Sequence, residues 1–65
     1  MDFITFNQVK KDKVNYVKYR DCQFKIWYDH YGPKWCCEAL NFEFAVTHCN
    51  SIKEVKESID WELDV

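Results

Sequence analysis

The chain has little of what flexible tails and linkers are made of. Its 65 residues include one glycine and one proline. Disordered segments combine such residues with few apolar side chains, whereas here 48% of the residues are hydrophobic and 18% are aromatic. The composition excludes disorder over most of the chain. It predicts a single domain over residues 1–65, near the lower size limit for folding without a disulfide or a metal.

Long apolar stretches are also missing. No run approaches the roughly 18 apolar residues that a membrane-spanning helix needs. Residues 1–13 lack the basic stretch followed by an apolar run that marks a secretory signal. These absences predict a cytoplasmic protein without membrane contact. In that compartment the four cysteines are expected to stay reduced.

The cysteines and the two histidines raise the question of a metal site or a nucleophile. A zinc site usually takes two ligands from a Cys-x₂₋₄-Cys pair, which the chain lacks, and adjacent Cys36 and Cys37 would point to opposite faces of a strand. No glycine-rich oxyanion motif accompanies a pairing of Cys37 or Cys49 with His30 or His48. A domain this small also has little room for a closed pocket. We therefore expect no metal, no cofactor and no enzymatic activity.

The best-marked element is a helix that opens at Ser51. Ser51 and Glu54 form the S-x-x-E pattern of a capping box. The apolar residues that follow recur at spacings of three and four, which places them on one helical face: Ile52, Val55, Ile59 and Leu63. Trp61 falls roughly opposite Ile52 and Ile59. The pattern predicts a C-terminal amphipathic helix with one aromatic side chain turned away from its core face.

Strand patterns precede this helix. Apolar and polar residues alternate over 22–28, and a turn at 30–33 leads to a returning strand over 35–40. Alternation over 42–47 indicates a third strand, with Asn41 at the junction as a tight turn or a bulge. Polar, basic residues 10–13 form a loop.

Two further strands are candidates in the N-terminal third. Residues 14–19 favour a strand, closed by a turn at Arg20 and Asp21, and residues 3–6 could open another. The expected fold is α+β, an antiparallel sheet of three to five strands with one C-terminal α-helix packed on one face. Phe24 and Ile26 should meet the helix, and Trp27 should lie on the opposite side of its strand unless the segment 3–9 folds over it.

The order of elements from Val17 to Leu63 resembles the small β-β-β-α proteins of phage and mobile-element genomes. The stretches that carry the resemblance are YRDCQFKIWYD, KWCCEA and SIKEVKESID. The last is similar to the helix that follows the sheet in HicB-like antitoxin domains, although AVTHCN stands where those domains have a Gly-rich stretch. The resemblance implies the fold and a phage or mobile-element origin, hence a host cytoplasm. It assigns no functional residues.

Charge is unevenly distributed along the chain. Residues 1–34 carry seven Lys/Arg and four Asp/Glu, giving +3, whereas residues 35–65 carry two and seven, giving −5. The total of −2 disfavours a general nucleic-acid binder. Ordinary solubilising charge would account for the pattern, and so would an acidic face that meets a basic partner.

The aromatic residues exceed what one helix stripe can cover. Trp and Tyr dominate the energetics of protein interfaces, and exposed aromatic patches usually mark a partner or dimer contact. The sequence therefore predicts a small binding protein that inhibits or modulates a protein partner, such as a host defence or host enzyme complex. The predicted contact residues are aromatic side chains with an acidic rim: Trp27, Tyr31, Trp35, Trp61, Glu38, Glu43 and Glu62.

Two alternatives remain open. Basic and aromatic residues interleave on adjacent predicted strands, as they do in sheets that bind single-stranded nucleic acid. The residues concerned, beside Trp27, are Lys18, Arg20, Lys25 and Tyr28. The other alternative is a homodimeric accessory domain whose aromatic patch is its own interface.

Overall fold

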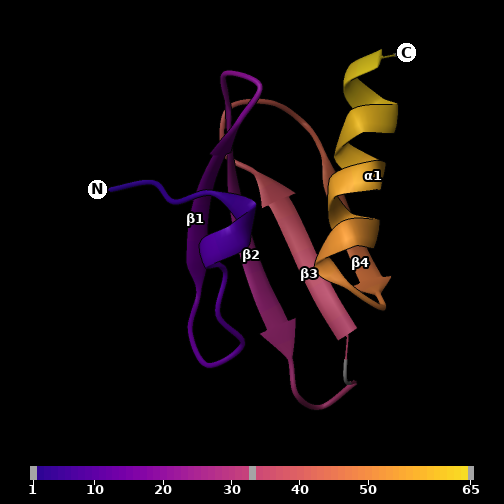
Figure 1. Ribbon diagram of the computed structural model, residues 1–65. Coiled ribbons are helices and arrows are strands. Elements are labelled where there is room, and N and C mark those ends of the chain that lie inside the picture. The colour runs from indigo at the N-terminus through magenta and orange to yellow at the C-terminus, as the bar shows by residue number, and fades with distance from the viewer. Residues whose placement is uncertain (1, 33, 65) are drawn as a thin grey trace.

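The computed structural model describes residues 2–32 and 34–64. Its elements are η1 (Phe6–Gln8), β1 (Asn15–Tyr19), β2 (Cys22–Asp29), β3 (Lys34–Ala39), β4 (Ala45–Cys49) and α1 (Ile52–Asp64). The strands form an antiparallel sheet in the order β1-β2-β3-β4, and α1 follows it (Figure 1). The expected α+β fold with one C-terminal helix is confirmed.

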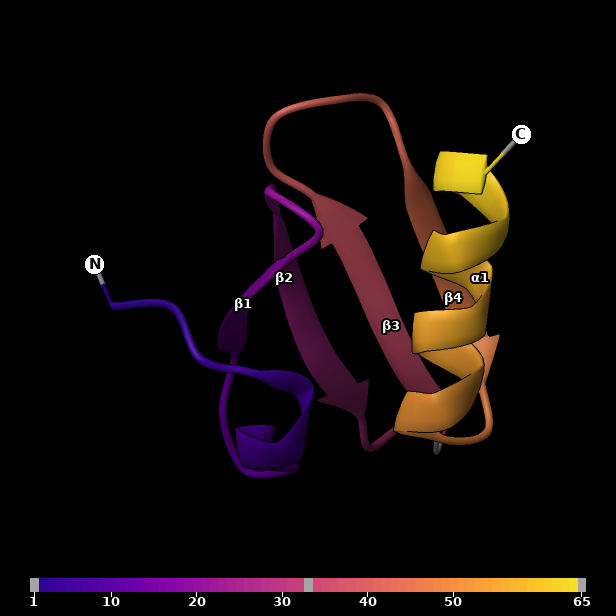
Figure 2. The ribbon, with the colours of Figure 1, turned by 45° about the horizontal axis from the view of Figure 1, so that its top comes forward.

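The elements that cover the sheet lie on one of its faces. Val55 and Ile59 of α1 are fully buried against the sheet, with β3 and β4 closest to the helix. The N-terminal segment lies on the same side, next to β1 and β2 (Figure 2), and its Ile4, Phe6 and Val9 pack against the core. This segment therefore adds to the helix-covered face and does not fold over the face that carries Trp27.

The core between these layers is built by alternate strand residues. Because successive side chains of a strand point to opposite faces, each strand contributes every second residue. The buried members of the cluster are Val17, Phe24, Ile26, Trp35, Cys37, Ala39, Cys49, Val55 and Ile59. Phe24 and Ile26 thus share one buried cluster with Val55 and Ile59 of the helix stripe, on the face where the sequence places them.

The helix begins as its sequence predicts. The Glu54 backbone N–H donates to the Ser51 hydroxyl oxygen at 3.2 Å, and the Glu54 carboxylate accepts from the Asn50 N–H at 2.8 Å. The carboxylate thus satisfies a donor one residue before the cap, instead of the Ser51 N–H of a standard capping box. Lys34 of β3 donates to the Asn50 side chain, which ties the sheet to the start of α1.

A two-residue turn joins β1 to β2, as expected. Tyr19 pairs with Cys22, and both intervening residues have positive φ, 51° at Arg20 and 64° at Asp21. Two positive φ values define the turn whose twist matches that of a β-hairpin. Asp adopts this conformation readily, whereas Arg20 does so at a cost that its contacts with α1 help to offset.

Two sequence predictions of strands need correction. Residues 3–6 form no full strand: Ile4 makes a single parallel bridge to Val17, and η1 follows. The strand predicted over 42–47 begins at Ala45, because Phe42 and Phe44 fold back on Phe24, with ring centroids 5.9 and 6.3 Å away. Burial of these rings outweighs their alternating pattern. The turn predicted at 30–33 is present at 30–32, and Pro33 lies outside the described residues.

Strand β4 contains one extra residue relative to β3. Trp35 pairs with Cys49 and Cys37 pairs with Val46, so two steps along β3 match three along β4. His48 in this bulge has a φ of 63°. Val46 and Cys49 are three residues apart, so in a regular strand they would point to opposite faces. The extra residue lets both point toward the core, where Cys49 is 4% exposed.

Candidate functional site

The sheet face opposite α1 is not covered by the helix or the N-terminal segment, and we call it the open face. One row crosses it completely, since Tyr16 pairs with Lys25, Lys25 with Glu38 and Glu38 with Ala45. In the neighbouring row, Trp27 of β2 pairs with Cys36 of β3. The side chains of the open face come from all four strands, so the register of the whole sheet fixes the distances between them.

Trp27 is the largest side chain on the open face. It is half-buried, and the Lys25 ammonium lies 5.3 Å from the centroid of its ring. Cys36 is buried to 6% exposure although no helix covers this face. Trp27 is the β2 partner of Cys36, and cross-strand partners stand about 5 Å apart, so the indole is within reach of the thiol. The half-buried Trp27 side chain therefore packs on the sheet and still presents apolar surface to solvent.

A shallow hollow opens beside Trp27, at the corner of the open face where β1 begins. Its volume is about 210 Å³. The segment before β1 forms one wall and the end of β2 forms the other. Its lining residues are Lys11, Asp12, Lys13, Val14, Trp27, Tyr28 and His30.

The wall before β1 is held in place by a buried asparagine. Asn15 is 1% exposed, and its side-chain oxygen accepts from the Lys10 N–H at 2.9 Å. Its amide nitrogen donates to the carbonyl oxygens of Lys10, Lys13 and Ile26, at 2.8, 3.0 and 3.1 Å. Buried polar groups of this kind fix one conformation when every bond is made. A segment rich in lysine is therefore tied to the first residue of β1 by three hydrogen bonds.

The opposite wall fixes the same segment from its other side. A ring nitrogen of His30 lies 3.2 Å from the Lys11 carbonyl oxygen. The Lys11 ammonium sits 4.5 Å from the centroid of the Tyr28 ring, and Tyr28 contacts His30 edge to face. Tyr28 also packs edge to face on Trp35, which links the hollow to the core.

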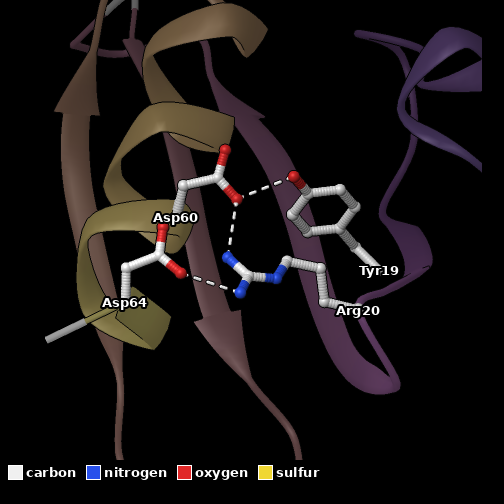
Figure 3. A network of polar contacts seen from close by, with 4 residues as sticks. All are labelled: Tyr19, Arg20, Asp60 and Asp64. Atoms are coloured by element: carbon white, nitrogen blue, oxygen red, sulfur yellow. Dashed lines mark hydrogen bonds and ion pairs between the residues drawn. The ribbon is translucent and has the colours of Figure 1, made fainter.

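A polar cluster at the other end of the hairpin fastens the sheet to α1 (Figure 3). The Tyr19 hydroxyl donates to Asp60 at 2.7 Å, and Arg20 contacts Asp60 at 3.3 Å and Asp64 at 2.8 Å. The Tyr19 hydrogen bond, followed by the Arg20 contact, lowers the pKa of Asp60 below its ordinary value. The same bond raises the pKa of Tyr19.

The buried thiols are poorly suited to nucleophilic chemistry. Burial, with smaller contributions from Cys49 and Cys36, raises the pKa of Cys37 to about 12. Burial also raises the pKa of Cys49. Because the thiolate is the reactive form of cysteine, both side chains are almost entirely protonated near neutral pH. Cys36 and Cys37 point to opposite faces of β3, as their adjacency predicts.

The predicted partner-binding residues do not form one surface. Trp27 and Glu38 share the open face, whereas Trp61 and Glu62 are exposed on α1, with Trp61 at 75% exposure. Tyr31 is fully exposed in the turn between β2 and β3, and Glu43 is exposed in the connection before β4.

Trp35 requires a correction. Its side chain is 7% exposed and belongs to the core, so it cannot act as a surface contact. Its position explains the error: Trp35 is in the same inward phase as Cys37 and Ala39, and an aromatic residue count does not reveal that phase.

The residues named for nucleic-acid binding are also divided. Lys18 and Lys25 lie on the open face with Trp27. Arg20 is engaged with Asp60 and Asp64 on the helix side, and Tyr28 packs against the core, so neither belongs to the open face. Sequence reasoning missed Lys11, Lys13 and Asn15, although the KKDK run with an asparagine two residues after it was a visible signal.

Two searches of the described residues give negative findings. Within residues 2–32 and 34–64, no three His, Cys, Asp or Glu side chains come together as a metal site would require. In the same part of the chain, no helix has the length and apolar character to cross a membrane. No protein-family model matches the chain, and neither curated proteins nor solved structures show significant similarity to it.

Proposed function

We propose that the chain is a non-enzymatic binding module that presents the open face of its sheet to a protein partner and modulates that partner's activity. The observation that carries the proposal is the placement of both covering layers. The helix and the N-terminal segment pack on the same face, and the opposite face keeps a half-buried tryptophan. A sheet with one uncovered face that carries large apolar side chains is a common basis for recognition.

The chemistry of the open face supports a protein partner. Trp27 and Tyr16 provide apolar area, and Lys25 and Glu38 stand beside them with opposite charges. Interfaces typically have this arrangement, with an aromatic anchor surrounded by polar side chains that contribute specificity. The strands fix the anchor, so little order is lost when a partner binds.

Single-stranded nucleic acid is the second candidate for the same face. The Lys25 ammonium lies over Trp27, and Lys18 lies on the same face opposite Gln23, farther along the sheet. Cations beside an aromatic ring are elements of sheet-based strand binding. The net charge of −2 weighs against it. Binding of a single-stranded oligonucleotide that weakens steeply with salt would support this candidate.

A bulky substitution at the open face tests the proposal. Ala45 is exposed at the end of the Tyr16–Lys25–Glu38–Ala45 row and outside the core cluster, so Ala45→Arg obstructs the face without disturbing the fold. Asn7→Arg adds the same charge at an exposed position of η1, on the covered side. We expect affinity capture from a lysate of the source cells to retain a protein with the wild type and with Asn7→Arg, and to lose it with Ala45→Arg.

The opposite results are equally informative. Retention of the same protein by Ala45→Arg would show that the open face is not the contact surface. A concentration-dependent doubling of mass for the wild type, abolished by Ala45→Arg, would show that a second copy of the chain occupies the face.

A further inference from the structure

The loop that forms one wall of the hollow beside Trp27 is held by several hydrogen bonds, although it lies at the edge of the sheet. Loops of this length are usually held by their end points alone. Here Asn15 makes four hydrogen bonds, three of them to the backbone of Lys10 and Lys13, and His30 contacts the carbonyl of Lys11. A fixed loop presents its side chains in one arrangement, as a preorganised binding site does.

Two of the side chains so presented are cationic and one is acidic. Lys11 and Lys13 line the hollow with one carboxylate, Asp12, between them in sequence. Across residues 2–32 and 34–64, the ion pairs formed are those of Arg20 with Asp60 and Asp64, so neither lysine is neutralised by an acidic side chain. The hollow therefore carries positive charge beside an apolar ring, although the whole chain carries −2.

The aromatic rings at the hollow favour one class of ligand over another. The Lys25 ammonium lies over the Trp27 ring, and the Lys11 ammonium lies over the Tyr28 ring. Single-strand binders need ring faces free for base stacking. The Lys11 ammonium over the Tyr28 ring still has N–H groups that can donate to a carboxylate, and the part of the Trp27 indole beyond Lys25 offers apolar contact.

We infer that this hollow binds an acidic segment of the protein partner, with carboxylates on Lys11 and Lys13 and an apolar side chain against Trp27. The inference rests on the proposed function and adds the chemistry of the partner. The outer surface of α1 is acidic and would repel a long polyanion that extends toward it. A short acidic peptide in the hollow is affected less, because exposed charges are screened beyond about 8–10 Å.

A titration of the isotope-labelled protein, followed by NMR, tests this inference. The probe is a synthetic peptide of about ten residues with glutamates around one leucine, and the control peptide has glutamine in place of glutamate. We expect the acidic peptide to shift the amide signals of residues 10–14 and the indole N–H of Trp27. Lys11→Gln with Lys13→Gln should weaken binding about fivefold to tenfold, whereas Lys53→Gln with Lys56→Gln, an equal charge change on α1, should not.

Three results would overturn the inference. One is equal binding of both peptides, another is equal loss in the two double variants, and the third is tighter binding of an oligothymidylate than of the acidic peptide. Failure here is separable from failure of the proposed function. Loss of capture in Ala45→Arg, together with no peptide binding, retains the open face as the contact surface and rejects the acidic segment.

Discussion

The two faces of this sheet are built from the same strands and differ in almost every other respect. On the covered face, α1 and the N-terminal segment bury alternate residues of all four strands, several of them completely. On the open face, the intervening residues of the same strands remain half-buried or exposed, Cys36 apart. The comparison separates residues that hold the fold from residues that are free for recognition.

Matched truncations on the two faces should give the largest difference. Ile59 is fully buried between α1 and the sheet, so Ile59→Ala leaves a cavity and should cost about 2–5 kcal/mol, enough to unfold much of a domain this small. Trp27→Ala removes more atoms but leaves no enclosed cavity, and we expect a cost of about 1 kcal/mol. Urea denaturation followed by circular dichroism measures both. Equal costs would mean that Trp27 belongs to the core.

Asn15 holds residues 10–13 against the start of β1, and a substitution there should release them. Asn15→Asp keeps the shape but replaces a donor of three hydrogen bonds with an oxygen that faces three carbonyl oxygens. The expected loss is about 2–4 kcal/mol, because the buried groups lose their partners. Hydrogen exchange should show residues 10–14 released before the sheet opens. Asn7→Asp, at an exposed site, serves as the control; an unchanged loop in Asn15→Asp would contradict the assigned role.

The attachment of α1 should depend on pH through Asp60. Its pKa is lowered in the folded protein, so the stability from its charged form is complete above the ordinary value of about 4 and is lost as pH falls through the lowered value. Wild type and Asp60→Asn should therefore differ at neutral pH and converge in acid. Urea midpoints measured across this range test the expectation. In a Tyr19→Phe background the difference should shrink, since Tyr19 is the main cause of the shift.

Trp61 should give the smallest effect on stability. It is 75% exposed on the far side of α1, so Trp61→Ala should change the free energy of unfolding by less than about 0.5 kcal/mol. Partner capture should also persist if the open face is the contact surface. Loss of capture in Trp61→Ala with retained folding would instead place a contact on the helix, as its sequence position alone suggests.

The sequence predicts the elements of the covered face well. Apolar residues recur with a period of about 3.6 residues in α1 and of about two residues in β2. Both patterns predict burial, because they place apolar side chains on one face of the element. The patterns fail where another interaction competes. Phe42 and Phe44 alternate like strand residues, but they pack on Phe24 as part of a loop.

The candidate site is less accessible to such reasoning. The alternation over 22–28 places Trp27 on the outer side of its strand, whereas the inward direction of Trp35 is shown by its burial and its pairing with Tyr28. The hollow joins residues 11–14 with 27–30, a contact that no local pattern contains. Asn15 lies in the strand predicted over 14–19, and its role depends on hydrogen bonds to Lys10, Lys13 and Ile26 that the strand pattern does not show.

The extra residue in β4 has a consequence for how the molecule meets other chains. An edge strand with an unbroken ladder offers its free backbone groups to any extended segment, and such pairing propagates into aggregates. At residues 47–48 the spacing of these groups is interrupted, and His48 adopts a left-handed conformation that a straight strand cannot match. An incoming strand could pair on one side of this interruption only. The bulge therefore shortens the stretch of the β4 edge that another strand can pair with.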